Sequence, residues 1–500
     1  MKLLREQPLF FFLFPVLFYL LGYTEYGHYI RLSQIGMPIL VFSILVVIIY
    51  LISKRVFIYH RKAALISIFL FGIGYCFFGD IKAALNQSPL PFLSKYPVML
   101  LLLLGTPVVT YLWLRVRNKI TDSLVEYVNY LTILLCVMQL VFIYQRKDTF
   151  VSSVKPISFS ATAVTTKPDI YLVVFDAYPG QISLKDYFQF DNSPTIQHLR
   201  DNGYFVPDTF QSNYNLTIGS MNSEFNMQYV NSKALYPWNH FNLYLKSFRA
   251  IRDAHLILFL QQQHYRIVNN SIFELGNTPQ QFEFPILKKG LDAIHLKMLH
   301  QQLWRHFSWI VNKGKWKNDF LFRRGYLRGH LLNQDILKAT LAPKQDKSPQ
   351  FMYSHVVMPH DPYFTDSTGK LLDFDHITAY RDTFRTFFID YLKYTNQRLR
   401  NLADSLVSMH PDAIIILQSD HGWRQYPEAK RHLMYNNFLA IHLPDSAYQQ
   451  LQPLHSNVNL FRILLNHYFD QRLPLLPDSS FYVDEEKNIF EPISIPFQRP

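Results

Sequence analysis

Three apolar stretches in the C-terminal part of the chain are each followed by residues that can bind a metal or move a proton. Asp176 directly follows the run IYLVVF, and His360 follows FMYSHVVM after one proline. The run AIIILQS is followed by Asp420, His421 and Gly422. A single Asp after a strand is most often a turn or helix cap, whereas Asp-His-Gly puts a carboxylate and an imidazole side by side. With a further oxygen donor, such a pair suits zinc, with manganese as the second choice.

A hydroxyl group that can join this set lies in the stretch SNYNLTIGSMNSEFNMQY (212–229). Thr217 stands at the predicted start of a helix, after the turn-forming SNYN. Its hydroxyl is either the helix N-cap or a nucleophile, helped by a helix N-terminus that receives an anionic group. An unassisted Thr hydroxyl is a weak nucleophile, so the second interpretation requires a metal or a base. Ser220 is the rival nucleophile in the same stretch.

Strands and helices in alternation must position these residues. Four runs are apolar on consecutive positions, which is typical of parallel strands buried on both faces: 169–175, 351–358, 413–419 and 438–443. Helix-like stretches such as 251–263 and 381–408 lie between them, so we predict an α/β domain with a mostly parallel sheet. Ligands bind at the carboxyl ends of the strands in such sheets, so the polar groups should meet at one edge.

The first third of the chain has a different character. Five apolar segments cover residues 9–23, 35–52, 63–78, 96–114 and 128–144. A membrane span needs about 20 apolar residues, and a buried helical domain of a soluble protein would have more polar surface than this third offers. We therefore predict a bundle of five transmembrane α-helices over 1–147, a linker over 148–168 and a catalytic domain over 169–500.

The charges of the short loops predict the orientation of this bundle. Basic residues gather before the first segment and in the second and fourth loops: Lys2, Arg5, Lys54, Arg55, Arg61, Lys62, Arg115, Arg117 and Lys119. The first and third loops have fewer, and Glu25 and Asp80 partly balance them. Since basic loops stay in the cytoplasm, we predict a multi-pass protein of the cell (inner) membrane, with a cytoplasmic N-terminus and an extracytoplasmic catalytic domain.

The formal net charge of +12 invites a nucleic-acid interpretation. No long Lys/Arg run or recognition motif is present, so we predict no nucleic-acid partner. The two cysteines, Cys76 and Cys136, both lie in apolar stretches and leave the C-terminal part without a disulfide framework.

The order of these motifs resembles the alkaline phosphatase and sulfatase superfamily: an apolar strand with Asp, Thr at a helix start, PHxP, then SDHG. The five-span architecture resembles its membrane branch, which includes lipoteichoic acid synthases and lipid A phosphoethanolamine transferases. The stretches 212–227 and 457–478 are similar to bacterial sulfatase-like hydrolase/transferases. The resemblance covers nearly the whole chain in architecture and about four short blocks in sequence.

The resemblance implies roles for particular residues. Asp176, Thr217, Asp420 and His421 would be the ligands of one catalytic divalent metal, with zinc first and manganese second. Thr217 would also be the nucleophile that carries a covalent phospho-intermediate, and His360 would contact the substrate or leaving group. His355, inside its strand, is expected to be structural.

The resemblance also implies a function. The protein would move a phosphorus-containing headgroup, of phosphoethanolamine or phosphoglycerol type, from a phospholipid donor to a glycan or lipid acceptor of the cell envelope. The alternatives are a phosphodiesterase or sulfuric ester hydrolase with the same site, and a non-catalytic membrane scaffold. The C/S-x-P-S-R motif of true sulfatases is absent from the sequence. The stretch RHLMYNNF (431–438) offers His432, Asn436 and Asn437 but no clear match to a further family histidine, and oligomeric state is not indicated.

Overall fold

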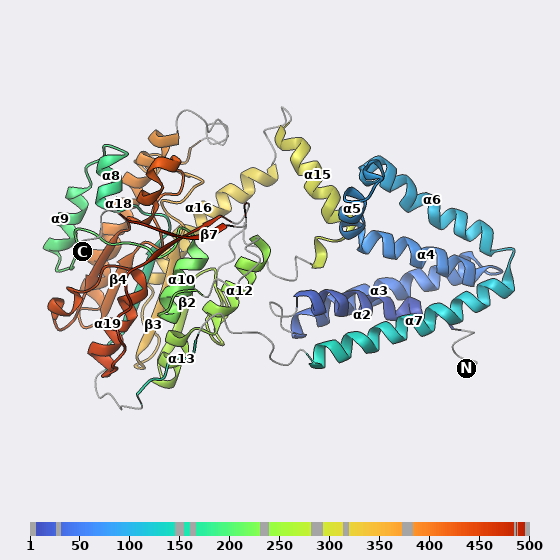
Figure 1. Ribbon diagram of the computed structural model, residues 1–500, viewed down its shortest axis with the longest axis horizontal. Helices are drawn as coiled ribbons and strands as arrows, with labels where there is room; N and C mark the ends of the chain where they lie inside the picture. Colours follow the sequence, from blue (N-terminus) through green and yellow to red (C-terminus); the bar gives the residue numbers. More distant parts are fainter. Residues whose placement is uncertain are drawn as a thin grey trace. The chain divides into compact units, whose positions relative to one another are not determined.

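The computed structural model describes residues 7–26, 32–145, 155–160, 167–230, 240–281, 294–313, 320–372, 384–484, 487 and 489–495. The chain divides into two compact units (Figure 1). The first unit comprises Met1–Phe150 together with Lys288–Lys317, and the second comprises Val151–Leu287 and Asn318–Pro500. The sequence did not predict that residues 288–317 group with the N-terminal helices.

The first unit is a bundle of apolar helices. Its elements are α2 (Leu9–Tyr26), α3 (Leu32–Val56), α4 (Arg61–Cys76), α5 (Phe78–Asn86), η1 (Pro91–Ser94), α6 (Tyr96–Leu114), α7 (Asn118–Gln145) and α15 (Leu299–Lys313). Four of them, α2, α3, α6 and α7, are long and apolar enough to cross a membrane, and the pair α4 and α5, bent by 68°, counts as a fifth if it is one span. The predicted N-terminal bundle of apolar helices is thus confirmed, and the five predicted spans correspond to four single helices and this bent pair.

The second unit is built on a five-stranded sheet. The strand order is β2 (Arg266–Asn270), β3 (Gln350–Val356), β1 (Ile170–Phe175), β4 (Ile414–Gln418) and β5 (Leu439–His442). β1 is the central strand and pairs in parallel with β3 and β4, and β2 pairs in parallel with β3. The mostly parallel sheet is therefore confirmed, and all four predicted strands lie side by side in it, with β3, β1 and β4 parallel to one another.

Strand β5 differs from the sequence prediction because it runs antiparallel to β4. A parallel partner would require a crossover connection, usually a helix of a dozen or more residues. The chain between β4 and β5 contains only the short 3₁₀ stretch η2 (Glu428–Tyr435), so the chain returns antiparallel. The edge strand β2, RIVNN, was not predicted, and its first three residues are only partly buried.

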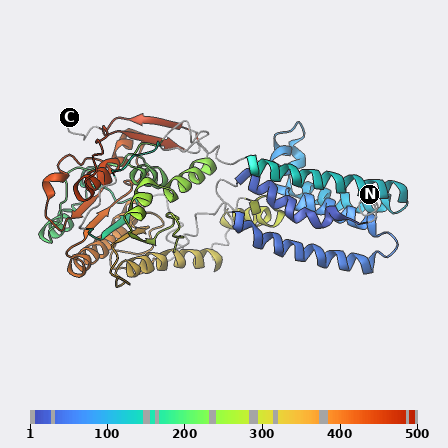
Figure 2. The same ribbon diagram turned by 90° about the horizontal axis from the view of Figure 1, so that it is seen from below.

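Helices cover both faces of the sheet (Figures 1 and 2). Alternate residues of β1 belong to two separate cores: Leu172 to one and Val173 to the other. The first core holds α10 (Thr217–Asn226), α12 (His240–Arg252), α13 (His255–Gln262) and α19 (Asn457–Phe469). The second holds α8 (Gln181–Asp186), α9 (Ser193–Asp201), α16 (Phe320–Thr340) and α18 (Phe384–Met409). The hairpin β6 (Ser480–Asp484) and β7 (Ile489–Ile493), red in Figure 2, completes the unit.

Candidate functional site

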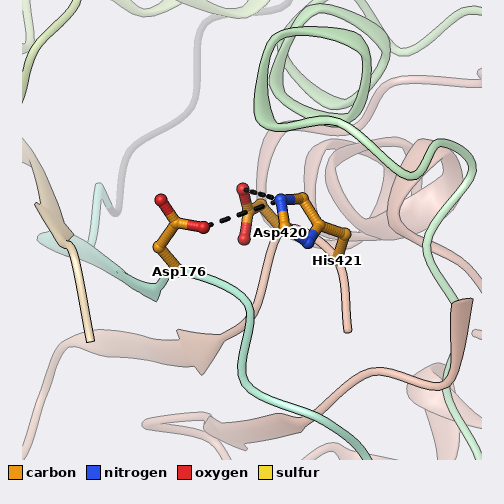
Figure 3. A group of neighbouring side chains, drawn as sticks. All are labelled: Asp176, Asp420 and His421. Atoms are coloured by element: carbon orange, nitrogen blue, oxygen red, sulfur yellow. Dashed lines mark ion pairs between the residues drawn. The ribbon is translucent and has the colours of Figure 1, made fainter. Parts of the chain in front are cut away.

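Asp176, Asp420 and His421 meet at the carboxyl end of the sheet. Asp176 directly follows β1, and Asp420 and His421 follow the neighbouring parallel strand β4 after one residue. One ligand atom of each residue lies within 4.8 Å of the others, and the three side chains point toward one another (Figure 3). His421 Nε2 is 3.6 Å from Asp176 Oδ1 and 3.5 Å from Asp420 Oδ2. The pairing of β1 with β4 therefore brings together residues that are far apart in the sequence.

The two carboxylates point oxygens without hydrogen bonds into this cluster. Among the described residues, Asp176 Oδ1 and Asp420 Oδ2 are buried and accept no hydrogen bond. The other oxygen of Asp420 accepts a bond of 3.1 Å from the backbone N–H of Ala177, which orients the group. Buried acceptors without partners are costly, and two carboxylate oxygens beside an imidazole nitrogen are a donor set that zinc accepts. The residues therefore fit a divalent cation.

His421 is held in the form that binds a metal. Its Nδ1 lies 2.7 Å from the carbonyl oxygen of Gly422, which assigns the proton to Nδ1 and leaves the lone pair of Nε2 facing the two carboxylates. Burial lowers the pKa of His421, which favours the neutral imidazole. The cluster thus presents one neutral nitrogen donor between two acidic side chains.

Asp176 is kept ionised by its surroundings. Burial alone would raise its pKa, but the nearby His360, His355 and His421 outweigh burial and hold the pKa well below the ordinary value of a carboxyl. His355 lies on β3, with its Nε2 3.6 Å from Asp176 Oδ2. Its Nδ1 is 2.7 Å from the Tyr353 hydroxyl, so the ring is held in place from behind. The fully buried His355 therefore supports Asp176 from outside the cluster.

Thr217 lies beside the same nitrogen. Its Oγ1 is 3.3 Å from His421 Nε2. Thr217 is the first residue of α10, and the N-cap is Leu216, with no side-chain cap bond. The interpretation of Thr217 as the N-cap is therefore wrong, and its hydroxyl faces the cluster. Ser220 is fully buried and donates a hydrogen bond of 3.1 Å to the carbonyl of Tyr214, so its hydroxyl is already used by the fold.

His360 lies next to the cluster and in contact with a residue that the sequence did not single out. The ring centroids of His360 and His421 are 6.5 Å apart. His360 Nδ1 is 2.5 Å from the carbonyl oxygen of Asp361, and its Nε2 is 2.7 Å from the guanidinium of Arg424. The ring thus donates from Nδ1 and accepts from Arg424 at Nε2. The only sign of Arg424 in the sequence was its position, as a basic residue three positions after His421.

The stretch after the Asp-His-Gly motif supports the backbone. Asn436 Oδ1 accepts a hydrogen bond of 3.0 Å from the N–H of Ser183, and Asn437 Nδ2 donates one of 3.0 Å to the carbonyl of Ser419. Both asparagines are buried, and His432 lies in η2. Asn436 and Asn437 thus fix the loops around β4.

Fold and site together define a class: an α/β domain that gathers two carboxylates, an imidazole and a hydroxyl at one sheet edge. The chain belongs to the sulfatase family, since the family model described as Sulfatase matches residues 172–467. A comparison with curated proteins finds no match.

Solved structures also resemble the chain. The C-terminal periplasmic domain of EptC from Escherichia coli, in complex with zinc, is 13% identical with a TM-score of 0.41, and the match covers 69% of this chain and 98% of that chain. A putative sulfatase, yidJ from Bacteroides fragilis, is 12% identical with a TM-score of 0.37, covering 66% and 84%. The C-terminal periplasmic domain of phosphoethanolamine transferase EptC from Campylobacter jejuni is 14% identical with a TM-score of 0.34, covering 63% and 92%.

Proposed function

We propose that this protein is a membrane-bound, metal-dependent transferase that moves a phosphorus-containing headgroup from a phospholipid to an acceptor of the cell envelope. The observation that carries the proposal is the hydroxyl of Thr217 beside a buried cluster whose acidic oxygens lack hydrogen bonds. The headgroup would be of phosphoethanolamine or phosphoglycerol type, and the acceptor a glycan or lipid. The absence of the C/S-x-P-S-R motif supports phosphoryl over sulfuryl chemistry.

The four side chains that would hold the divalent cation, zinc first and manganese second, are Asp176, Thr217, Asp420 and His421. A bound cation supplies charge neutralisation and a lower pKa for a coordinated hydroxyl. Thr217 Oγ1 forms the bond to phosphorus while the bond from phosphorus to the diacylglycerol oxygen breaks. An acceptor hydroxyl then displaces Thr217 and takes the headgroup.

The residues around the nucleophile serve an anionic substrate. Thr217 is the first residue of α10, and a helix N-terminus favours an anionic group. His360 contacts the substrate or leaving group from the opposite loop, and Arg424 holds its Nε2 while adding a positive charge. With Nδ1 as the donor and Nε2 bonded to a permanent cation, His360 acts by position and hydrogen bonding while that contact lasts.

The membrane bundle fits a lipid donor. We propose that the N-terminus is cytoplasmic, that the spans cross the cell membrane, and that the catalytic domain, residues 169–500 apart from the inserted segment 288–317, works on the extracytoplasmic side. The basic residues of the second and fourth loops support this orientation. A transferase in this position has its donor in the adjacent leaflet.

The decisive experiment is intact-mass analysis of the full-length protein in lipid nanodiscs. We expect a mass increase that equals phosphoethanolamine or phosphoglycerol, mapped by peptide analysis to Thr217. Thr217→Ser should retain an adduct, because a primary hydroxyl can replace the secondary one, and Thr217→Ala should lose it. An adduct of unchanged amount in Thr217→Ala would contradict the assignment of the nucleophile.

The second candidate is a phosphodiesterase or sulfuric ester hydrolase that uses the same residues, and membership of the sulfatase family favours it. It differs only in that water replaces the acceptor hydroxyl. Radiolabelled phospholipid separates the two: label that moves to an envelope glycan or lipid supports transfer, and label that appears only as free headgroup supports hydrolysis. Unchanged cell phenotype with Thr217→Ala would instead favour the non-catalytic scaffold.

A further inference from the structure

One segment of the first unit comes from the middle of the chain. Residues 294–313 stand in the sequence between β2 and β3 of the catalytic sheet, yet they pack with the N-terminal helices. Ile294 is fully buried against Gly22 of α2, where an added Cβ would lie 2.7 Å from the Ile294 side chain. The carbonyl of Lys297 accepts a hydrogen bond of 2.7 Å from the N–H of Gly79. At both places a glycine permits the close approach.

Lys297 joins this segment to acidic residues at one end of the bundle. Its Nζ lies 2.5 Å from Glu25, in the last turn of α2, and 3.0 Å from Asp80, in the first turn of α5. Glu25 and Asp80 are the two acids that the sequence predicted in the first and third loops, and the structure places them in helix ends. The segment is therefore docked at the end of the bundle opposite the basic second and fourth loops.

The place of α15 in the first unit follows from its contacts with α5 and with the start of α6. Leu299 belongs to a buried cluster with Met99 and Leu103, which lie one and two turns inside α6. His306 stacks on Tyr96, the first residue of α6, with ring centroids 4.2 Å apart. α15 otherwise packs against α5, so its first two turns lie at the end of the bundle where the candidate span α6 begins.

An adjoining side of α15 carries large apolar side chains that remain exposed. Leu303 is 36% exposed, Trp304 47% and Phe307 56%. Their spacing of one, three and four residues places them on one face of the helix. α6 likewise exposes Leu101 and Leu104, at 73% and 61%, as expected of a helix that faces lipid.

We propose that α15 lies in the membrane interface, with Leu303, Trp304 and Phe307 inserted among the lipids of the leaflet at the Glu25 end of the bundle. An amphipathic helix in this position buries its apolar face about 5–10 Å into the boundary of headgroups and acyl chains, and Trp prefers that level. The catalytic part of the chain is then tied to the bilayer surface a second time, by an insertion between β2 and β3.

Spin labels in the full-length protein test this proposal. In a background with Cys76→Ala and Cys136→Ala, single labels are placed by Trp304→Cys or Phe307→Cys, and the protein is studied in phospholipid nanodiscs. Leu101→Cys in α6 is the lipid reference, and Gln197→Cys, on the exposed side of α9, is the aqueous reference. We expect the ratio of oxygen to nickel-chelate accessibility at 304 and 307 to rise above that at 197 and approach that at 101.

Two results would overturn the proposal. Labels as accessible to the nickel chelate as at 197 would put this face of α15 in water, and labels shielded from both reagents would put it against protein. The variant Lys297→Glu sharpens the test, because it replaces two ion pairs with repulsion. It should shift the label at 304 toward the aqueous value and leave the label at 101 unchanged. No shift would show that lipid contact does not depend on the docked position.

Discussion

The catalytic unit contains two groups of buried acids with opposite hydrogen bonding. Asp176 and Asp420 each keep one buried oxygen without a hydrogen bond, and both point these oxygens at His421. Glu224, seven residues after Thr217 on α10, is fully buried. Both of its oxygens accept bonds of 2.7 Å from Gln418, and one accepts a further bond of 3.2 Å from Asn457.

This difference in hydrogen bonding distinguishes a candidate ligand site, formed by Asp176 and Asp420, from a structural contact, formed by Glu224. Nearby histidines hold the pKa of Asp176 below its ordinary value, whereas burial raises the pKa of Glu224 to about 8. Gln418 is the last residue of β4, so Glu224 ties the helix that begins at Thr217 to the strand that precedes Asp420. Burial alone does not mark a functional acid, because both groups are buried. What distinguishes Asp176 and Asp420 from Glu224 is that their oxygens without hydrogen bonds converge on one point.

The largest effect is expected when a cluster carboxylate loses its charge. Asp420→Asn should weaken zinc binding by more than about 100-fold, because even the loss of an outer partner of a metal ligand costs 10–100-fold. Glu224→Gln is the matched control, since it replaces the carboxyl group of an equally buried acid whose oxygens are already bonded. Isothermal titration of the metal-free protein with zinc measures both. An equal loss of zinc affinity in Asp420→Asn and Glu224→Gln would show that the two kinds of buried acid do not differ in metal binding.

Metal removal should lower the melting temperature of the wild-type protein. Without the cation, the carboxylates of Asp176 and Asp420 face each other across His421, and one oxygen of each accepts no hydrogen bond from the described part of the chain. A ligand present at about 100 times its dissociation constant raises the free energy of unfolding by about 2.7 kcal/mol. Chelation of the metal should therefore lower the free energy of unfolding by about that amount. Differential scanning fluorimetry with and without a chelator measures it. Asp420→Asn should respond less, and an equal response would place the stabilising metal elsewhere.

Arg424 should have an intermediate effect on catalysis. Arg424→Gln removes the charge beside His360, and a hydrogen bond to a charged group contributes about 1.5–3 kcal/mol, so turnover of an anionic donor should fall roughly 10–100-fold. Arg424→Lys should recover only part of this, since Lys lacks the planar fork. The control is Arg431→Gln, because Arg431 instead covers the Tyr482 ring at 4.0 Å. Equal turnover in both Gln variants would exclude Arg424 from the site.

The position of the cluster of Asp176, Asp420 and His421 was predictable for a simple physical reason. Asp176, Asp420 and His421 follow continuous apolar runs, and parallel strands bring their carboxyl ends to one edge. Their proximity needed no knowledge of side-chain packing. The roles of these residues and of Thr217 stay predictions until the adduct and metal binding are measured.

Features that depend on contacts between distant loops could not be predicted in this way. Arg424 follows no strand directly, and only the fold shows that its guanidinium meets His360. Glu224 sits inside a polar helical stretch, where nothing in the sequence distinguishes a surface acid from a buried one. The docking of residues 294–313 depends on Gly22 and Gly79, whose missing side chains leave no pattern in hydropathy. The antiparallel direction of β5 goes with a connection that contains a 3₁₀ stretch in place of a crossover α-helix, which the run of apolar residues did not reveal.

The last prediction concerns the pH dependence of stability that Glu224 causes. Its pKa is about 8 in the folded state and 4.5 as the ordinary value. The folded state therefore holds a proton that the unfolded state loses, and stability from this group is present below about pH 4.5 and lost as pH rises toward 8. Glu224→Gln cannot titrate. The melting temperature of the wild-type protein should thus fall relative to the variant between pH 5 and pH 8, by roughly 2–4 °C per kcal/mol.

The contribution of Glu224 is isolated only by the difference in melting temperature between the wild-type protein and Glu224→Gln. Burial lowers the pKa of His421, so that group adds stability as pH rises through the same window and partly hides the effect in the wild type alone. Since His421 is present in both proteins, its contribution cancels in the comparison. A difference in melting temperature that stays constant from pH 5 to pH 8 would show that Glu224 does not change its charge there. Glu224 would then hold its contact with Gln418 in a single protonation state from pH 5 to pH 8.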